Sequence, residues 1–308
     1  MSKVETPILI EDEFLRDGLQ NEDRLFSVNE KLAFLRHLEE AGVRRIQVGS
    51  FVHPTRVPQM ANTDDLVRQI EPKEGVTYTA LVLNEAGLRR ALAVGLRHLS
   101  ISISASEAHS QKNLNRSVHD ALTRIVPVIE MALAEGVQVR AGIQSALGCA
   151  FEGRISPAKT RFLAQQFVDL GVQEINIADT AGLANPGQVS SLCCALKATF
   201  PETAFSLHLH DTRGLGLANM YAGLEAGIRI FDTALGGLGG CPFVPDASGN
   251  IATEDAAFLC DELGLESGVD WQKLRGAVDQ AEVLLGRELP GKSAHVPVPP
   301  WKRSSQAA

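Results

Sequence analysis

Short strand-like runs and longer helix-like segments alternate along almost the whole chain, and this alternation restricts the fold more than any other feature. Each run is rich in Ile, Val, Leu and Thr, and a helical pattern separates it from the next. Parallel strands need crossovers of this kind, which are usually helices. The strand-like runs cover approximately residues 7–13, 44–51, 76–83, 98–105, 138–145, 174–180, 204–211 and 228–235.

Eight such repeats close into a barrel more readily than they form an open sheet. We therefore predict an α/β fold, a (β/α)₈ TIM barrel with an additional C-terminal helix over residues 271–286. The alternative is an open doubly wound sheet, but no strand is followed by the glycine-rich turn typical of dinucleotide-binding proteins. We expect one domain over residues 1–308, with an extended or disordered tail from about residue 288 and a functional loop over residues 240–251.

Several predicted helices have recognisable ends. Ser27-Val28-Asn29-Glu30 is a capping box. The pairs Ser156-Pro157 and Asn185-Pro186 each place an N-cap residue before a proline at the first helical position. Pro127 lies inside the helical pattern over residues 117–136 and is expected to kink or restart that helix.

Charge and composition exclude several classes of protein. The net charge of −8 and the absence of a Lys/Arg cluster argue against a nucleic-acid partner. No apolar run is long enough to span a membrane, and residues 1–6 show neither a signal-peptide core nor an Arg-rich transit segment. The five cysteines are an odd number without CxxC spacing, which is typical of reduced thiols, so we expect a cytoplasmic protein.

The run Phe205-Ser206-Leu207-His208-Leu209-His210-Asp211-Thr212 alternates apolar and polar residues with the period of a β-strand. His208 and His210 therefore point to the same face, where two imidazoles on a rigid strand can bind one cation. The alternative is a pair of unrelated polar histidines on an exposed strand face. Further ligand-type residues elsewhere in the chain would favour the cation site over the pair of unrelated histidines.

Barrel enzymes place their active sites at the C-terminal ends of the strands. Asp17, the two histidines and the amide oxygen of Asn250 would form a mixed oxygen and nitrogen ligand set that suits Mg²⁺ or Mn²⁺. Zinc is less favoured, because structural zinc prefers thiolates. Taken singly, Asp17 and Asn250 are typical turn or cap residues, so the prediction depends on their convergence. The polar residues at these positions are Arg16, Asp17, Gln47, Asp179, Thr180, His208 and His210, with Asn250 in the loop after the last strand.

The segment Arg16-Asp17-Gly18-Leu19-Gln20-Asn21-Glu22 resembles the opening signature of the hydroxymethylglutaryl-CoA lyase family, part of a superfamily of metal-dependent lyase and aldolase barrels. The resemblance continues in order over almost the whole chain. Further matching segments are Gly49-Ser50-Phe51-Val52, Val57-Pro58-Gln59-Met60, Lys112-Asn113-Leu114-Asn115, Ala146-Leu147-Gly148-Cys149, His208 to Thr212, residues 236–243 and residues 247–255.

The resemblance implies a divalent-metal-dependent carbon–carbon lyase that acts on an acyl-CoA substrate, and a homodimer. It implies Asp17, His208, His210 and Asn250 as metal ligands. It also implies that Arg16 stabilises enolate charge at the thioester oxygen, that Cys241 donates a proton, and that Asp179 is an acidic residue needed for catalysis. The residues with implied substrate contacts are Arg16, Gln20, Asn113, Ser145, Thr180 and Arg213.

This chemistry can be followed physically. The substrate would carry a hydroxyl group β to a thioester, and the cation would acidify and orient that hydroxyl. A base, either Asp179 or His208, removes the proton, and the C–C bond breaks to give a ketone and a thioester enolate. Arg16 stabilises the developing charge, and Cys241 protonates the enolate carbon. The alternative for Cys241 is an ordinary loop thiol.

Several positions depart from the family pattern near the predicted site. Gln47, a candidate catalytic residue, stands where the family usually has a glutamate at the end of strand 2, so hydrogen bonding is kept and a charge is lost. Phe14-Leu15 replaces Gly-Pro, Ser145 a cysteine, Ala150 a proline and Arg213 a tyrosine. Arg213 is either a solvated surface cation or a partner for an extra carboxylate or phosphate.

Three functions are therefore compared. The first is cleavage of 3-hydroxy-3-methylglutaryl-CoA, or a closely related 3-hydroxyacyl-CoA, to acetyl-CoA and a keto acid such as acetoacetate. The second is a Claisen-type synthase or 2-oxo-acid aldolase of the same superfamily, which is not expected to share Cys241 and its glycine-rich loop. The third is a catalytically impaired protein that binds CoA thioesters, which the complete metal set disfavours.

Overall fold

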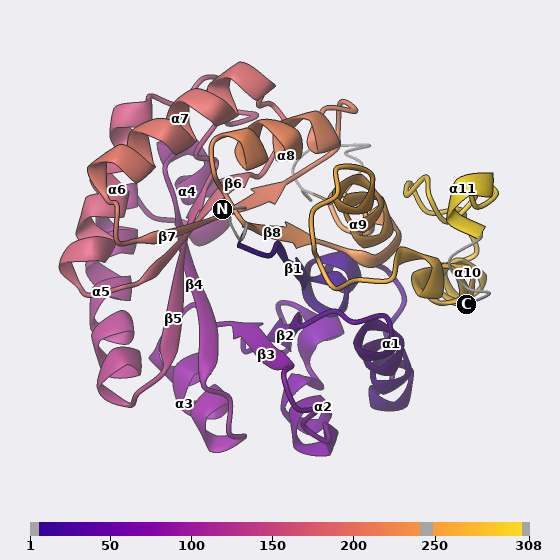
Figure 1. The fold of residues 1–308 in the computed structure, drawn as a ribbon. Helices are drawn as coiled ribbons and strands as arrows, with labels where there is room; N and C mark the ends of the chain where they lie inside the picture. Colours follow the sequence, from indigo (N-terminus) through magenta and orange to yellow (C-terminus); the bar gives the residue numbers. More distant parts are fainter. Residues whose placement is uncertain (1–5, 241–248, 304–308) are drawn as a thin grey trace.

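The computed structural model describes residues 6–240 and 249–303. Eight parallel strands form a closed barrel in which each strand pairs with its neighbours in sequence and β1 pairs with β8. Helices surround the barrel (Figure 1), so the predicted TIM barrel is confirmed. The strands are β1 (Leu9–Asp12), β2 (Arg45–Ser50), β3 (Thr77–Leu81), β4 (His98–Ser104), β5 (Gln138–Gln144), β6 (Glu174–Asp179), β7 (Ala204–Leu209) and β8 (Ile230–Thr233).

The helices follow the strands as crossovers. None of the described helices is both long enough and apolar enough to cross a bilayer. Three short turns are η1 (Phe14–Gly18), η2 (Pro58–Met60) and η3 (Leu235–Gly237). The helices are α1 (Val28–Glu40), α2 (Thr63–Gln69), α3 (Glu85–Ala93), α4 (Glu107–Leu114), α5 (Val118–Ala134), α6 (Pro157–Asp169), α7 (Pro186–Thr199), α8 (Gly216–Glu225), α9 (Thr253–Glu262), α10 (Trp271–Leu285) and α11 (Pro300–Arg303).

The predicted helix ends are confirmed by their hydrogen bonds. At the start of α1, the backbone N–H of Ser27 donates to Oε2 of Glu30 at 2.8 Å, and Ser27 Oγ accepts from the backbone N–H of Glu30. Pro157 and Pro186 are the first residues of α6 and α7. Pro127 was expected to kink or restart the helix; α5 runs through it without a break, so the helix does not restart there, and its apolar face is packed on the core.

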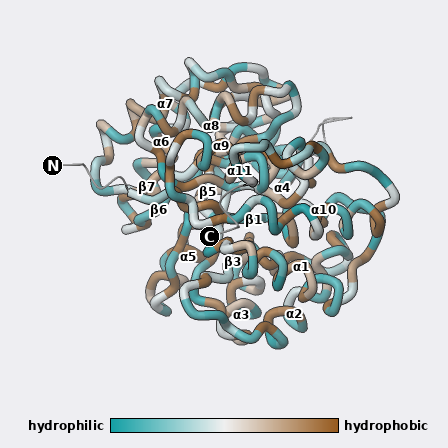
Figure 2. The backbone as a smooth tube through the Cα atoms, turned by 45° about the vertical axis from the view of Figure 1, so that its right-hand side comes forward, coloured by the Kyte–Doolittle hydropathy of each residue, from teal (hydrophilic) through white to brown (hydrophobic). Residues whose placement is uncertain are grey.

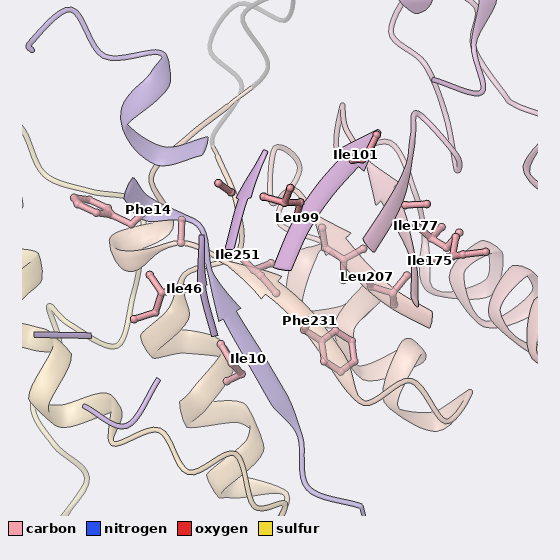
Figure 3. Close-up of a cluster of buried hydrophobic side chains, with 14 of the residues drawn as sticks. Ile10, Phe14, Ile46, Leu99, Ile101, Ile175, Ile177, Leu207, Phe231 and Ile251 are labelled. Atoms are coloured by element: carbon pink, nitrogen blue, oxygen red, sulfur yellow. The ribbon is translucent and has the colours of Figure 1, made fainter. Parts of the chain in front are cut away.

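Each strand has two buried faces with different chemistry. Hydrophobic and hydrophilic residues alternate along the chain (Figure 2), and strand residues such as Ile10, Leu207 and Phe231 belong to the hydrophobic core (Figure 3). The alternate positions are polar: Arg45 of β2 binds Glu174 of β6 through two hydrogen bonds of 2.8 and 2.9 Å. Since β2 and β6 are not neighbours in the sheet, these polar side chains meet inside the barrel.

The chain after α10 lies against α9 and the turn η3. Leu289 is buried, the backbone N–H of Gly291 donates to the carbonyl of Gly236 at 2.9 Å, and Ser293 N–H donates to Asp255 at 2.6 Å. The proline content predicts an extended or disordered segment here. Its described part, up to residue 303, has little regular structure but is anchored to the barrel by these contacts. The extent of a single domain over residues 1–308 stays a prediction.

Glu254, in the first turn of α9, gives a prediction about stability and pH. It is fully buried, and burial raises its pKa from 4.5 to about 8. Between these two pH values, the folded protein keeps a proton on Glu254 that the unfolded chain releases. The contribution of Glu254 to the free energy of unfolding is therefore fully present below pH 4.5 and is lost as the pH rises to about 8. We expect Glu254→Gln to gain stability relative to the parent as the pH is raised from 5 to 8, as measured by urea unfolding. The exposed Glu225→Gln is the control; an equal stability difference at both pH values would contradict the prediction.

Candidate active site

A cavity of about 220 Å³ opens among side chains that follow the C-terminal ends of the strands. Most of the residues predicted from the sequence either line it or touch a residue that does. Arg16, Asp17, Gln20, Asn113, Thr180, His208 and His210 line the cavity. Cys241 lies outside the described residues, but Gly240, the residue before it, also lines the cavity.

The four residues predicted as metal ligands come together. One ligand atom each from Asp17, His208 and His210 lies within 4.8 Å of the others, and all three side chains are buried. Nε2 of His208 is 2.9 Å from Nε2 of His210, which is 3.8 Å from Oδ2 of Asp17. Asn250 pairs with His210 through an isolated β-bridge, and its Nδ2 donates to Oδ2 of Asp17 at 2.8 Å. His208 and His210 therefore do not lie on an exposed strand face; they are buried beside Asp17 and Asn250.

The backbone approaches this cluster closely at Gly239. A Cβ atom at that position would lie 2.5 Å from Nδ2 of Asn250 and 3.0 Å from Oδ2 of Asp17. The φ angle of Gly239 is +121°, which other residues rarely adopt. A glycine is therefore required where the loop after β8 passes the cluster.

Arg16 sits on a single π-helical turn, η1, immediately after β1. Such turns often occur at functional sites. Its guanidinium contacts all three neighbours that can accept a hydrogen bond: Glu13 and Gln47, and Oδ1 of Asp17 at 2.5 Å. A guanidinium has five N–H donors, so one N–H on each terminal nitrogen stays available to a substrate.

A network of charged side chains fills the barrel below the cavity. Arg140 of β5 binds Asp232 of β8 at 2.5 Å and both Glu11 and Glu13 at 2.9 Å. Oδ2 of Asp232 also accepts from Asn176 at 3.0 Å. Branched aliphatic residues usually fill a TIM barrel, whereas buried charged side chains occupy the interior of this one.

The network sets the protonation of the two histidines. Burial alone would lower the pKa of His208, but Asp232, at 3.3 Å from its Nδ1, together with Glu13 and Asp17, raises it. Burial and the neighbouring His208 lower the pKa of His210 to about 3. A neutral imidazole has a free lone pair, so His210 is ready to bind a cation.

The remaining predicted residues, Ser145, Asp179 and Arg213, do not line the cavity. Ser145 is buried with φ of +54°, and its backbone N–H donates to Oγ1 of Thr180 at 2.9 Å. Asp179 is buried, and its carboxylate accepts from the backbone N–H groups of residues 183 and 184 at 2.9 and 3.0 Å. Arg213 is exposed, donates to the carbonyl groups of residues 181 and 182, and does not line the cavity.

The cavity lining includes Glu13, Arg140, Asn176 and Asp232, which are not among the residues predicted from the sequence. Arg140 and Asn176 follow the period-two alternation that also holds for His208 and His210, so a signal for them is present. Glu13 follows two other acidic residues and Asp232 stands beside Thr233, so alternation does not identify their faces. Nor does it identify which charges pair.

Comparisons with known proteins identify a family over nearly the whole chain. A family model described as HMGL-like matches residues 8–280. A hydroxymethylglutaryl-CoA lyase of Bacillus subtilis is 37% identical over 281 residues, 91% of this chain and 94% of that protein. An (R)-citramalyl-CoA lyase of Chloroflexus aurantiacus is 40% identical over 293 residues, 92% of each.

A solved structure is also similar over nearly the whole chain. It is an HMG-CoA lyase from Acinetobacter baumannii in complex with coenzyme A and 3-methylmalate, with a TM-score of 0.89 and 33% identity, covering 97% of this chain and 100% of that one. The match to the family model and the identities above 30% over most of the chain show the family. The chain therefore belongs to the HMGL-like family and is a lyase of the hydroxymethylglutaryl-CoA lyase type.

Proposed function

We propose that the protein is a divalent-metal-dependent carbon–carbon lyase that cleaves 3-hydroxy-3-methylglutaryl-CoA or a closely related 3-hydroxyacyl-CoA. The observation that carries the proposal is the cluster of Asp17, His208 and His210 beside the Arg16 guanidinium in one cavity. A cation site next to a fixed positive charge suits a reaction in which an alkoxide forms at one end of the substrate and an enolate at the other.

The residues present fit a divalent cation. The 2.9 Å between the Nε2 atoms of His208 and His210 is close to the roughly 3 Å expected for two adjacent ligands at about 2.1 Å from one ion. Oδ1 of Asn250 is buried and has no hydrogen-bond partner among the described residues, so it is free to act as a ligand. The mixed oxygen and nitrogen set favours Mg²⁺ or Mn²⁺.

The charges inside the barrel also favour a dication. Three guanidinium groups make ion pairs with five carboxylates in the described network, which leaves two negative charges in excess when all are ionised. Buried charge without compensation is costly, so a divalent ion would balance the cluster. The members are Arg16, Arg45 and Arg140 with Glu11, Glu13, Asp17, Glu174 and Asp232.

The cavity accommodates the acyl part of such a substrate. Its volume of about 220 Å³ is below the usual range for sites that enclose a whole ligand, so the CoA moiety would extend out of the mouth. The Acinetobacter structure contains coenzyme A and 3-methylmalate, which supports binding of a CoA thioester by this chain. The homodimer and the cytoplasmic location stay predictions.

The chain's own residues can perform each step of the cleavage. A bound cation supplies Lewis acidity that makes the substrate hydroxyl easier to deprotonate. Loss of the proton lets the C–C bond break, which gives a ketone and the enolate of acetyl-CoA. The two N–H groups of Arg16 that are not used inside the protein then stabilise the enolate oxygen, and Cys241 protonates the enolate carbon.

Of the two candidate bases, we favour Asp179. A ring nitrogen that holds a cation cannot accept a proton at the same time, so a ligand role for His208 leaves Asp179. Burial raises the pKa of Asp179, and each carboxylate oxygen that accepts one backbone N–H keeps a second lone pair. Its neighbours Ala178 and Thr180 line the cavity whereas Asp179 itself does not, so its role as the base would require proton transfer through bound water.

Cys241 gives a direct prediction. We expect Cys241→Ser to lower kcat by about 10²–10⁴-fold, because a hydroxyl is a far weaker acid than a thiol, while metal binding is retained. Steady-state kinetics and calorimetric titration with Mn²⁺ would measure the two effects. The exposed Cys194 provides the matched control, Cys194→Ser, which should keep parental activity. Undiminished turnover in Cys241→Ser would remove this thiol from the mechanism.

A substrate panel tests the proposed function. Purified protein with Mg²⁺ or Mn²⁺ would be given 3-hydroxy-3-methylglutaryl-CoA, citramalyl-CoA and longer-branched analogues, and acetyl-CoA release would be followed. Release from the first compound supports hydroxymethylglutaryl-CoA as substrate. Release only from citramalyl-CoA supports the second candidate, which the 40% identity to the Chloroflexus enzyme favours. Condensation in place of cleavage, or binding without reaction, would contradict the proposal.

A further inference from the structure

Three side chains hold the guanidinium of Arg16: the carboxyl groups of Glu13 and Asp17 and the amide of Gln47. Glu13 contacts one terminal nitrogen of Arg16, and the amide oxygen of Gln47 accepts from its Nε. The amide nitrogen of Gln47 donates to Oε1 of Glu13 at 2.9 Å. Glu13 and Gln47 are both fully buried, so their charges matter more than they would in water.

Gln47 stands where the resemblance to the family predicts a glutamate, and the geometry shows why an amide suits this chain. A carboxylate at position 47 would bring an oxygen to about the place of the amide nitrogen, which is 2.9 Å from an oxygen of Glu13. Two ionised carboxylates only about 3 Å apart in a buried site repel each other, so one of them has to take up a proton. With an amide at position 47, Arg16 keeps its contacts with Glu13, Gln47 and Asp17, and no second carboxylate faces Glu13 there.

We propose that Glu13 is the positioning residue that supplies, from the end of β1, the carboxylate that the family supplies from the end of β2. The guanidinium of Arg16 thereby keeps a second anionic partner beside Asp17, although position 47 carries an amide. The proposal rests on the proposed function, because Arg16 is the residue that would meet the enolate oxygen of the thioester.

Glu13 is held rigidly enough for this role. Its backbone N–H donates to the carbonyl of Thr233 at 2.7 Å, and its own carbonyl accepts from the N–H groups of Arg16 and Gly18 at 3.0 and 3.1 Å. Its Oε1 also binds Arg140 at 2.9 Å. Strand β1, the turn η1 and Arg140 thus fix both ends of the residue, and Glu13 in turn fixes Arg16.

The test exchanges the two side chains. Glu13→Gln and Gln47→Glu would be made singly and together, and kcat and KM would be measured for the substrate found in the panel at saturating cation. We expect each single variant to lower kcat by about 10–100-fold, with KM changed much less. The double variant should recover to within a few-fold of the parent. In an Arg16→Gln background, Glu13→Gln should have little further effect on kcat.

Asp255→Asn is the control, because Asp255 is a buried carboxylate of α9 that accepts from the backbone N–H groups of residues 292 and 293 and makes no contact with Arg16, Glu13 or Gln47. It should reduce stability and leave kcat within a few-fold. Unchanged kcat in Glu13→Gln, or a double variant no better than the poorer single one, would overturn the proposal.

Failure of the proposed function has a different signature. If the parent cleaves no thioester, the same four proteins are compared by urea unfolding. Recovery of the unfolding free energy in the double variant would support the charge exchange between positions 13 and 47. Additive losses would overturn it. The two failures are therefore distinguishable.

Discussion

Replacing Arg140 by methionine is expected to lower the free energy of unfolding by about 3–5 kcal/mol, or to prevent folding altogether. The Arg140 side chain is 3% exposed and makes ion pairs with Glu11, Glu13 and Asp232. Methionine fills much of the same volume but leaves these three carboxylates close together inside the barrel without their shared cation. Because removal of one partner of a buried ion pair leaves an uncompensated charge, the loss exceeds the value of the pair itself.

Urea unfolding followed by circular dichroism would measure this loss. Arg89→Met is the matched control, because Arg89 pairs with Glu85 on the surface of α3 and its side chain is 66% exposed. Surface pairs of this kind contribute about 0–1 kcal/mol, so the control should differ little from the parent. An Arg140→Met variant within about 1 kcal/mol of the parent would show that the network is not needed for stability.

His208→Ala is expected to abolish both cation binding and turnover. Loss of the imidazole removes a predicted ligand 2.9 Å from His210 and leaves Asp232 without the group it faces at 3.3 Å. A Lewis acid contributes several kcal/mol to such a reaction, so kcat should fall by at least about 10³-fold.

Mn²⁺ binding, measured by calorimetry or electron paramagnetic resonance, separates the two effects of this substitution. His119→Ala on the exposed surface of α5 is the control and should match the parent in both measurements. If His208→Ala bound Mn²⁺ as tightly as the parent, His208 would not be a ligand, and its function would lie in proton transfer alone.

Much of the fold could be predicted because its signals are local. The strand-like runs correspond to β1–β8 to within a few residues, and the caps at Ser27, Ser156 and Asn185 start α1, α6 and α7. Hydrogen bonds between a cap and the first turn depend on residues three positions apart, which a sequence displays directly. The restart expected at Pro127 does not occur, because the packing of α5 on the core outweighs the local signal.

In the candidate site, residues at strand ends could be grouped from the sequence, whereas the direction of an exposed side chain could not. Asp17, His208, His210 and Asn250 were grouped because barrel strands end on one face, and the structure brings them together. Arg213 was selected from its position after the histidine strand, but it turns to the carbonyl groups of residues 181 and 182. Where an exposed side chain points is decided by nearby backbone acceptors, which do not leave a periodic pattern.

By itself, the sequence determined which residues share a face of each strand, since the side-chain period of a strand is two. It did not determine what that face meets. Only the closed barrel places Arg45 opposite Glu174, and Arg140 among Glu11, Glu13 and Asp232. Such pairs join strands that are far apart in sequence and across the barrel from one another. Closure of the barrel and the register of its strands therefore determine which side chains pair. The low dielectric constant of the interior then makes each ion pair, or each unpaired charge, energetically large.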